Sequence, residues 1–135
     1  MTQSQQHIII VDDEAPAREM VGEYLKMHGF GVTLCDGGKT LREAIEISVP
    51  DLVVLDLNMP DIGGVEVVEF IRGQDKLRRL PILIVTTRGD EASQERVLAA
   101  GASRFMTKPF TPEKILGEVR GLLAVGAESS ERPRS

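Results

Sequence analysis

The chain contains 135 residues, of which 41% are hydrophobic and 27% are charged, and its formal net charge is −5. These values are typical of one globular domain, and the negative charge argues against direct binding of nucleic acid or of an acidic membrane surface. No apolar run approaches the roughly 20 residues that span a bilayer. A single cysteine, Cys35, rules out an internal disulfide and favours a reducing compartment, so we expect a cytoplasmic protein.

Short apolar runs without polar alternation recur along the chain, as in strands that are buried on both faces of a parallel sheet. They alternate with segments that carry apolar residues at helical spacing. The strands are expected at residues 7–11, 32–35, 52–55, 81–85 and 104–107. The helices are expected between Pro16 and Gly29 and at residues 41–48, 65–71, 90–100 and 111–123.

This fivefold alternation between residues 7 and 125 predicts one α/β domain, with a parallel sheet and helices on both of its faces. Thr111 suits the N-cap of the last helix, and Pro112 suits its first turn. The polar ends, residues 1–6 and 126–135, are expected to be a disordered N-terminus and a disordered tail or linker stub.

A polar residue stands at the end of four of the expected strands. Asp12 and Asp13 follow the first strand, and Asp56 follows the third. Thr86 follows the fourth strand, and Lys108 follows the fifth. Because the carboxyl ends of parallel strands share one edge of a sheet, we expect these side chains to converge there.

Three carboxylates at one spot repel one another, and a hard divalent cation relieves that repulsion. Mg²⁺ prefers oxygen ligands, accepts one or two carboxylates and pairs readily with phosphate, whereas the spacing of a calcium-binding EF-hand is missing. A carboxylate can also attack phosphorus and form an acyl phosphate. Mg²⁺, the Lys108 ammonium and the Thr86 hydroxyl could each neutralise one phosphoryl oxygen.

These motifs resemble those of the receiver domain of two-component response regulators, of the chemotaxis type. Each motif alone is weak, but together, in order and each at a strand end, they are specific. The resemblance implies a flavodoxin-like fold with a five-stranded parallel sheet of order 2-1-3-4-5. The matching motifs, within about residues 7–124, are residues 8–14, residues 56–60 with Gly64, residues 85–87 and residues 108–110.

The resemblance implies that Asp56 is the phosphoacceptor and that Mg²⁺, for which Mn²⁺ could substitute, is the cofactor. Asp13 and Asp56 would bind the metal directly, together with the backbone carbonyl of Asn58. Asp12 would bind it mostly through water.

The resemblance also implies a set of residues that respond to the phosphoryl group. Lys108 would pair with that group, and the Lys108–Pro109 bond is expected to be cis. Thr86 would be the switch hydroxyl, and Phe105 occupies the place of the aromatic side chain that rotates.

Three further positions would tune the lifetime of the phosphoryl group. Asn58 and Arg88 resemble the pair that controls dephosphorylation, and because neither is a general base for water, we expect slow self-hydrolysis. Thr87 stands where the family more often has Ala, Gly or Ser. Since a β-branched residue is bulkier and stiffer, it would narrow the access of small phosphodonors and of water.

The implied function is a phosphorylation-controlled signalling switch and not an enzyme. A sensor histidine kinase or a histidine phosphotransfer protein would donate the phosphoryl group. The face formed by the fourth helix, fifth strand and fifth helix would then change its affinity for a target. That target is either a separate protein or the missing output domain of a longer DNA-binding or enzymatic regulator, which the length of the natural reading frame would decide.

Two other hypotheses remain from the sequence. An aspartyl-phosphate hydrolase of the haloacid dehalogenase type shares the nucleophile, Mg²⁺ and a parallel sheet. It requires a second acid at the place of Asn58 and normally a longer chain. A degenerate receiver would bind partners without phosphorylation, which the intact set of acids, threonine and lysine argues against.

Overall fold

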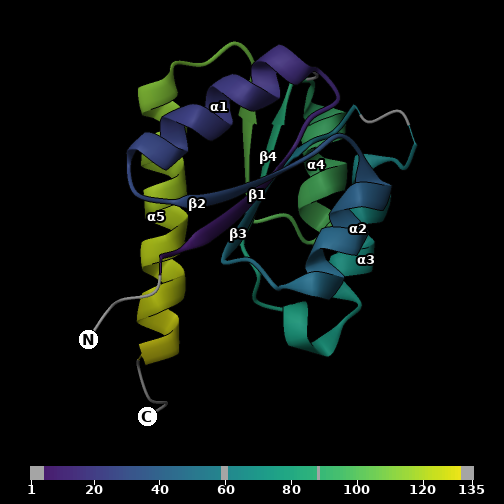
Figure 1. Cartoon of the computed structure of the whole chain (residues 1–135). Coiled ribbons are helices and arrows are strands. Elements are labelled where there is room, and N and C mark those ends of the chain that lie inside the picture. Colours follow the sequence, from purple (N-terminus) through teal and green to yellow (C-terminus); the bar gives the residue numbers. More distant parts are fainter. Residues whose placement is uncertain (1–4, 59–60, 88, 132–135) are drawn as a thin grey trace.

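Five parallel strands form one sheet of order β2-β1-β3-β4-β5 in the computed structural model, which describes residues 5–58, 61–87 and 89–131 (Figure 1). Neighbouring strands are in register at their carboxyl ends, with Val11 opposite Leu55 and Asp56 opposite Val85. The predicted strand order and parallel pairing are therefore confirmed. The strands are β1 (His7–Val11), β2 (Gly31–Cys35), β3 (Leu52–Asp56), β4 (Ile82–Thr86) and β5 (Arg104–Thr107).

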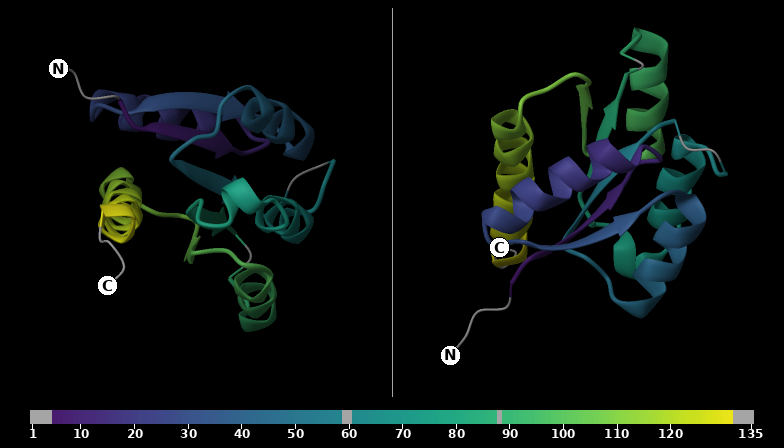
Figure 2. Two further views of the ribbon diagram at one scale, coloured as in Figure 1. Left: turned by 90° about the horizontal axis from the view of Figure 1, so that it is seen from below. Right: turned by 45° about the horizontal axis from the view of Figure 1, so that its top comes forward.

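Helices cover both faces of the sheet, as the alternation of elements predicted. Figures 1 and 2 show α1 and α5 on one side of the sheet and α2, α3 and α4 on the other. The helices are α1 (Ala15–Met27), α2 (Gly38–Ile47), α3 (Gly64–Arg72), α4 (Glu91–Ala100) and α5 (Pro112–Glu131), and a short 3-10 helix, η1 (Asp75–Leu77), precedes β4. None of the helices in the described ranges is long and apolar enough to cross a membrane.

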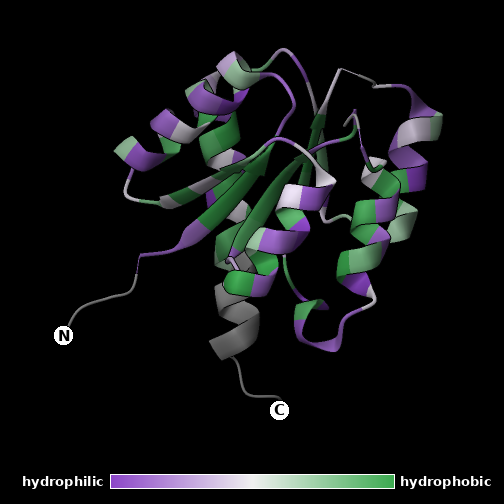
Figure 3. Ribbon diagram, turned by 45° about the vertical axis from the view of Figure 1, so that its right-hand side comes forward, coloured by the Kyte–Doolittle hydropathy of each residue, from purple (hydrophilic) through white to green (hydrophobic). Residues whose placement is uncertain are grey.

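The apolar core lies in two layers, one on each face of the sheet. Ile8, Ile10 and Val54 point toward α1 and α5, whereas Ile9 and Leu55 point toward α2, α3 and α4. Figure 3 accordingly shows the strands at the centre of the sheet as mostly hydrophobic ribbons. Because successive side chains of a strand alternate between faces, a strand buried on both faces needs an unbroken apolar run, which is the pattern of residues 8–11.

The helix starts follow the signals in the sequence. Pro16 stands in the first turn of α1. The Thr111 hydroxyl accepts a hydrogen bond from the Lys114 N–H at 3.1 Å, and the Asp90 carboxylate accepts one from the Ser93 N–H at 3.0 Å. These bonds satisfy N–H groups that have no partner within their own helix.

The last helix is longer than the sequence predicted. It ends at Glu131, so residues 126–131, which we assigned to a disordered tail or linker stub, continue α5. Ala127 and Glu128 favour a helix, and Pro133 is the first residue beyond them that opposes one. Residues 1–4 and 132–135 lie outside the described residues.

Candidate functional site

The carboxyl ends of β1 and β3 bring three acidic side chains together. Asp12 follows β1 and Asp56 ends β3, which is the neighbouring strand. Carboxylate oxygens of Asp12, Asp13 and Asp56 all lie within 4.8 Å of one another. Asp12 and Asp56 are only 7% and 5% exposed, whereas Asp13 is exposed. The convergence expected from the strand ends is therefore present in the fold.

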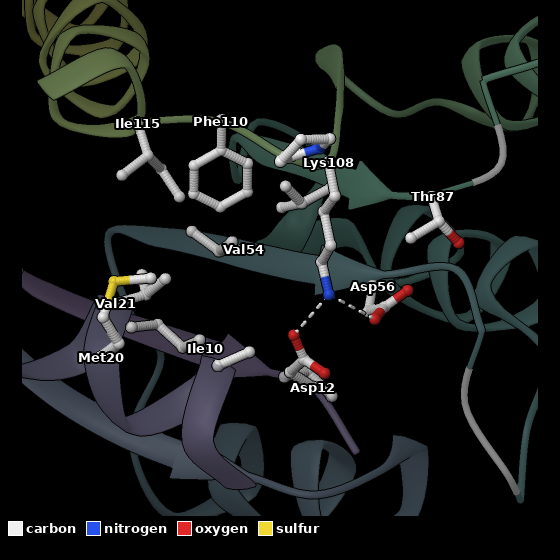
Figure 4. A pocket seen from close by; sticks show the side chains of 14 residues that line it. Ile10, Asp12, Met20, Val21, Val54, Asp56, Thr87, Lys108, Phe110 and Ile115 are labelled. Atoms are coloured by element: carbon white, nitrogen blue, oxygen red, sulfur yellow. Dashed lines mark hydrogen bonds and ion pairs between the residues drawn. The ribbon is translucent and has the colours of Figure 1, made fainter. Parts of the chain in front are cut away.

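Lys108 supplies a positive charge between the two buried acids. Its Nζ lies 2.8 Å from Asp12 Oδ2 and 3.1 Å from Asp56 Oδ2 (Figure 4). The Lys108 N–H donates to the Thr86 carbonyl at 2.8 Å, which holds this residue beside the end of β4. The Lys108–Pro109 bond is cis, as predicted.

The positive charge of Lys108 does not cancel the negative charges of the acids in this cluster. Burial raises the pKa of Asp56, and the hydrogen bond from the Asn58 N–H and the charge of Lys108 offset that effect only in part. At Lys108, burial alone would lower the pKa, but the hydrogen bonds and charges of Asp12 and Asp56 outweigh it and raise the pKa. One ammonium thus stays protonated without fully compensating the buried carboxylates.

The backbone around Asp12 is fixed by several hydrogen bonds. Asp12 Oδ1 accepts from the Glu14 N–H at 3.0 Å, and the Asp12 N–H donates to the Cys35 carbonyl at 3.1 Å. Arg18 Nη1 reaches back from α1 and donates to the Asp12 carbonyl at 2.7 Å. We did not predict this role for Arg18, although a cation one turn into the helix that follows two acids is a recognisable signal.

The loop after Asp56 brings Leu57 and Gly64 into close contact. The Asn58 N–H donates to Asp56 Oδ1 at 2.9 Å. A Cβ on Gly64 would lie 2.6 Å from Leu57 Cδ2 and 2.9 Å from Leu57 Cα. Only a glycine therefore allows the two ends of this loop to approach so closely, which gives a physical reason for Gly64 in the motif.

The residues expected to switch lie on the other face of the sheet. Thr86 is fully buried at the end of β4, and by strand alternation it shares a face with Ile84. Phe105 is opposite Ile84 on β5 and packs half-buried on the same core layer. Asp56, by contrast, shares with Val54 the face that points toward α1 and α5. Arg88 lies outside the described residues.

A cavity of about 340 Å³ opens beside the acidic cluster, between α1, the sheet and the start of α5. Its walls are mainly apolar, with Met20 and Phe110 on opposite sides (Figure 4). Asp12, Asp56 and Lys108 line one end of it, and the exposed Thr87 lies beside them. Thr87 thus lines the same cavity as Asp56, and its expected role in restricting access stays a prediction.

The donor set fits a hard divalent cation. Carboxylate and carbonyl oxygens are the ligands that Mg²⁺ prefers, and Mg²⁺ uses only one or two carboxylates while it retains water. Asp56 and the exposed Asp13 can offer such oxygens, and a cation there would offset the charge that Lys108 leaves uncompensated.

Comparison with known protein families identifies the same region of the chain. A family model described as the response regulator receiver domain matches residues 8–120. The phosphate regulon transcriptional regulatory protein PhoB of Pseudomonas aeruginosa is 32% identical over 127 residues, which are 93% of this chain and 56% of that protein. The response regulator MprA of Mycolicibacterium vanbaalenii is 37% identical over 118 residues, or 86% and 49%. The chain thus spans about half the length of these relatives.

Two solved structures of similar proteins share the fold over nearly their whole length. The chemotaxis response regulator CheY4 of Vibrio cholerae superposes with a TM-score of 0.84 at 28% identity, covering 88% of this chain and 99% of that one. A BeF3-activated DrrB receiver domain superposes with a TM-score of 0.80 at 28% identity, covering 90% and 99%.

The raised pKa of Asp56 predicts a stability effect that depends on pH. An acid whose pKa is higher in the folded than in the unfolded state costs stability above the folded pKa, and the cost disappears as the pH falls through that value. In the absence of Mg²⁺ at neutral pH, Asp56→Asn should therefore unfold at a higher temperature than the wild type. The difference should shrink in acid.

Thermal unfolding followed by circular dichroism across a pH series measures this effect. Glu69→Gln, which neutralises an exposed acid on α3, is the matched control and should leave Tm nearly unchanged. A wild type more stable than Asp56→Asn at neutral pH would contradict the electrostatic account.

Proposed function

The chain belongs to the receiver-domain family of two-component response regulators, and from that premise we propose that a phosphoryl group on Asp56 switches it. The observation that carries this proposal is the position of the Asp56 carboxylate. It is buried at the carboxyl edge of the sheet, 3.1 Å from the Lys108 ammonium and beside two further acids.

The reaction is a transfer between two nucleophiles. Asp56 attacks the phosphorus of a phosphohistidine, the P–N bond breaks as a P–O bond forms, and an aspartyl phosphate results. Asp13, Asp56 and the Asn58 carbonyl would hold Mg²⁺, and Asp12 would hold it through water. When bound, this metal neutralises phosphoryl oxygens. Lys108 is already within hydrogen-bond distance of Asp56, so it needs little movement to pair with the new group.

The switch connects the two faces of the sheet. In the phosphorylated domain the Thr86 hydroxyl donates a hydrogen bond to a phosphoryl oxygen, and its movement frees space on the face that it shares with Phe105. Phe105 borders a second hollow of about 440 Å³, which Gln94 of α4 and Lys114 and Glu118 of α5 also line. Repacking of Phe105 would therefore change the surface formed by α4, β5 and α5, to which a target binds.

The family and the shape of the site support a phosphodonor protein and a target as partners. A sensor histidine kinase or a histidine phosphotransfer protein donates the phosphoryl group in the cytoplasm. The apolar cavity beside Asp56, with Met20 46% exposed at its edge, can accept an apolar side chain of that donor. The target is a separate protein or an output domain of a longer regulator, and about half of each full-length relative lies outside the matched region.

The other hypotheses have less support. A haloacid dehalogenase needs an acid where this chain has Asn58, and the family match is to receivers. A degenerate receiver would not need Lys108 between two buried acids. The domain acts as a signalling switch that assists its own phosphorylation and dephosphorylation, and Asn58 and Arg88 make the latter slow.

Mass spectrometry tests this function directly. With Mg²⁺ and a small donor such as acetyl phosphate, the intact wild type should gain one phosphoryl group, and Asp56→Asn should gain none because it lacks the nucleophile. Asp51→Asn, which changes an exposed aspartate outside the cluster, is the control and should be modified like the wild type. Equal modification of Asp56→Asn, or steady turnover of a phosphomonoester by the wild type, would refute the proposal.

Thr87→Ala tests whether the side chain at the mouth of the site controls access. The smaller residue should accelerate acetyl phosphate uptake and shorten the lifetime of the aspartyl phosphate, each by about 2- to 10-fold, because water and donor meet less hindrance. Both rates can be followed by quenched-flow mass spectrometry, with Thr87→Val as an isosteric control. Unchanged rates in Thr87→Ala would show that Thr87 does not act as a barrier.

A further inference from the structure

We propose that Asp61 is a positioning residue, which anchors the loop after the phosphoacceptor to the N-terminus of α2 and thereby sets the affinity of the site for Mg²⁺. This inference rests on the function proposed above. It concerns the segment between β3 and α3, of which the described residues 57–58 and 61–63 are here named the acceptor loop.

Both oxygens of the Asp61 carboxylate bind the start of α2. Oδ1 accepts a hydrogen bond from the Gly38 N–H, and Oδ2 accepts one from the Lys39 N–H, each at 3.0 Å. Oδ1 also accepts from the Ile62 N–H at 2.8 Å. These backbone donors, Lys39 first and then Gly38, lower the pKa of Asp61, so the group is ionised at neutral pH.

The cap of α2 comes from a different part of the chain than the caps of α4 and α5. Asp90 and Thr111 each cap the helix that they precede. In α2 the N-cap residue is Gly37, which has no side chain to accept the free N–H groups at the helix start. Asp61 supplies the missing acceptor, and its negative charge suits the positive end of the helix dipole.

The contact also requires small residues on the α2 side. A Cβ on Gly38 would lie 2.8 Å from Ile62 Cβ, and a Cβ on Gly37 would lie 2.7 Å from Asp61 Oδ1. The glycine pair thus lets the acceptor loop approach the backbone of α2 directly. The contact therefore needs both the carboxylate of Asp61 and the two glycines at the start of α2.

The contact lies close to the proposed metal ligands along the chain. Only two residues separate Asn58 from Asp61. On the other side, the Asn58 N–H is bound to Asp56 Oδ1 at 2.9 Å, and Leu57 packs against Gly64. The chain is therefore anchored at Asn58 and again, three residues later, at Asp61, and loss of the Asp61 anchor would give the Asn58 carbonyl more freedom before the metal arrives.

Amide NMR of the whole chain can measure Mg²⁺ affinity by titration, and thermal unfolding without Mg²⁺ can measure stability separately. Asp61→Ala should bind Mg²⁺ about tenfold more weakly than the wild type, as when a supporting group behind a metal ligand is removed. Asp61→Asn keeps one carbonyl oxygen and should lie between the two. In both variants the Gly38 and Lys39 amide resonances should move, because they lose the carboxylate acceptor.

Thr40→Val is the matched control. The Thr40 hydroxyl accepts from the Gly37 N–H at 3.3 Å at the same end of α2, and it donates to Asp36 and to the Gly37 carbonyl rather than to Asp61. Its removal should lower Tm while leaving the Mg²⁺ affinity unchanged.

Wild-type Mg²⁺ affinity in both Asp61 variants, with only a lowered Tm, would overturn this inference alone, because Asp61 would then be merely a helix cap. Absence of Mg²⁺ binding by the wild type, or binding that Asp56→Asn does not affect, would overturn the proposed function together with it.

Discussion

Two buried carboxylates share one ammonium at the carboxyl edge of the sheet, and the rest of the structure depends on this arrangement. Asp12 and Asp56 both contact Lys108, and both are almost fully buried. Burial makes the ionised form of Asp56 costly, and the ammonium compensates only part of that cost. A domain that keeps such a cluster has a site that a divalent cation and a phosphoryl group can complete.

The fold provides this site by giving the sheet two apolar faces and a polar edge. On β1 and β3, the apolar residues that point toward α1 and α5 are followed on the same face by Asp12 and Asp56. Residues of β4 and β5 that point the other way include Thr86 and Phe105. In the proposed function, a change at Asp56 would pass across this edge to Thr86 and Phe105 and from there to the surface formed by α4, β5 and α5.

Much of this arrangement could be predicted from local sequence patterns. Unbroken apolar runs identified the strands, and the parallel sheet that they imply made the polar residues at their ends converge. The predicted positions of Asp12, Asp56 and Lys108 follow from that single argument. The family resemblance added Asn58 as an expected metal ligand and Thr86 as the expected switch hydroxyl, which strand patterns alone do not indicate and which stay predictions.

Other features depend on contacts between distant parts of the chain, so local patterns could not indicate them. Asp61 reaches the start of α2, and Arg18 reaches back to the carbonyl of Asp12. The buried Leu77 of η1 and the extension of α5 to Glu131 were also missed. In each case the deciding factor is packing against another element or the absence of a strong helix breaker, and neither is a periodic signal.

Anomalous diffraction from a crystal soaked in Mn²⁺ tests the central claim most directly, because Mn²⁺ can replace Mg²⁺ and is located without ambiguity. The account predicts one strong peak bonded to carboxylate oxygens of Asp13 and Asp56, on the side of the cluster that Lys108 leaves open. A peak bound elsewhere, with these carboxylates free of metal at saturating Mn²⁺, would contradict it.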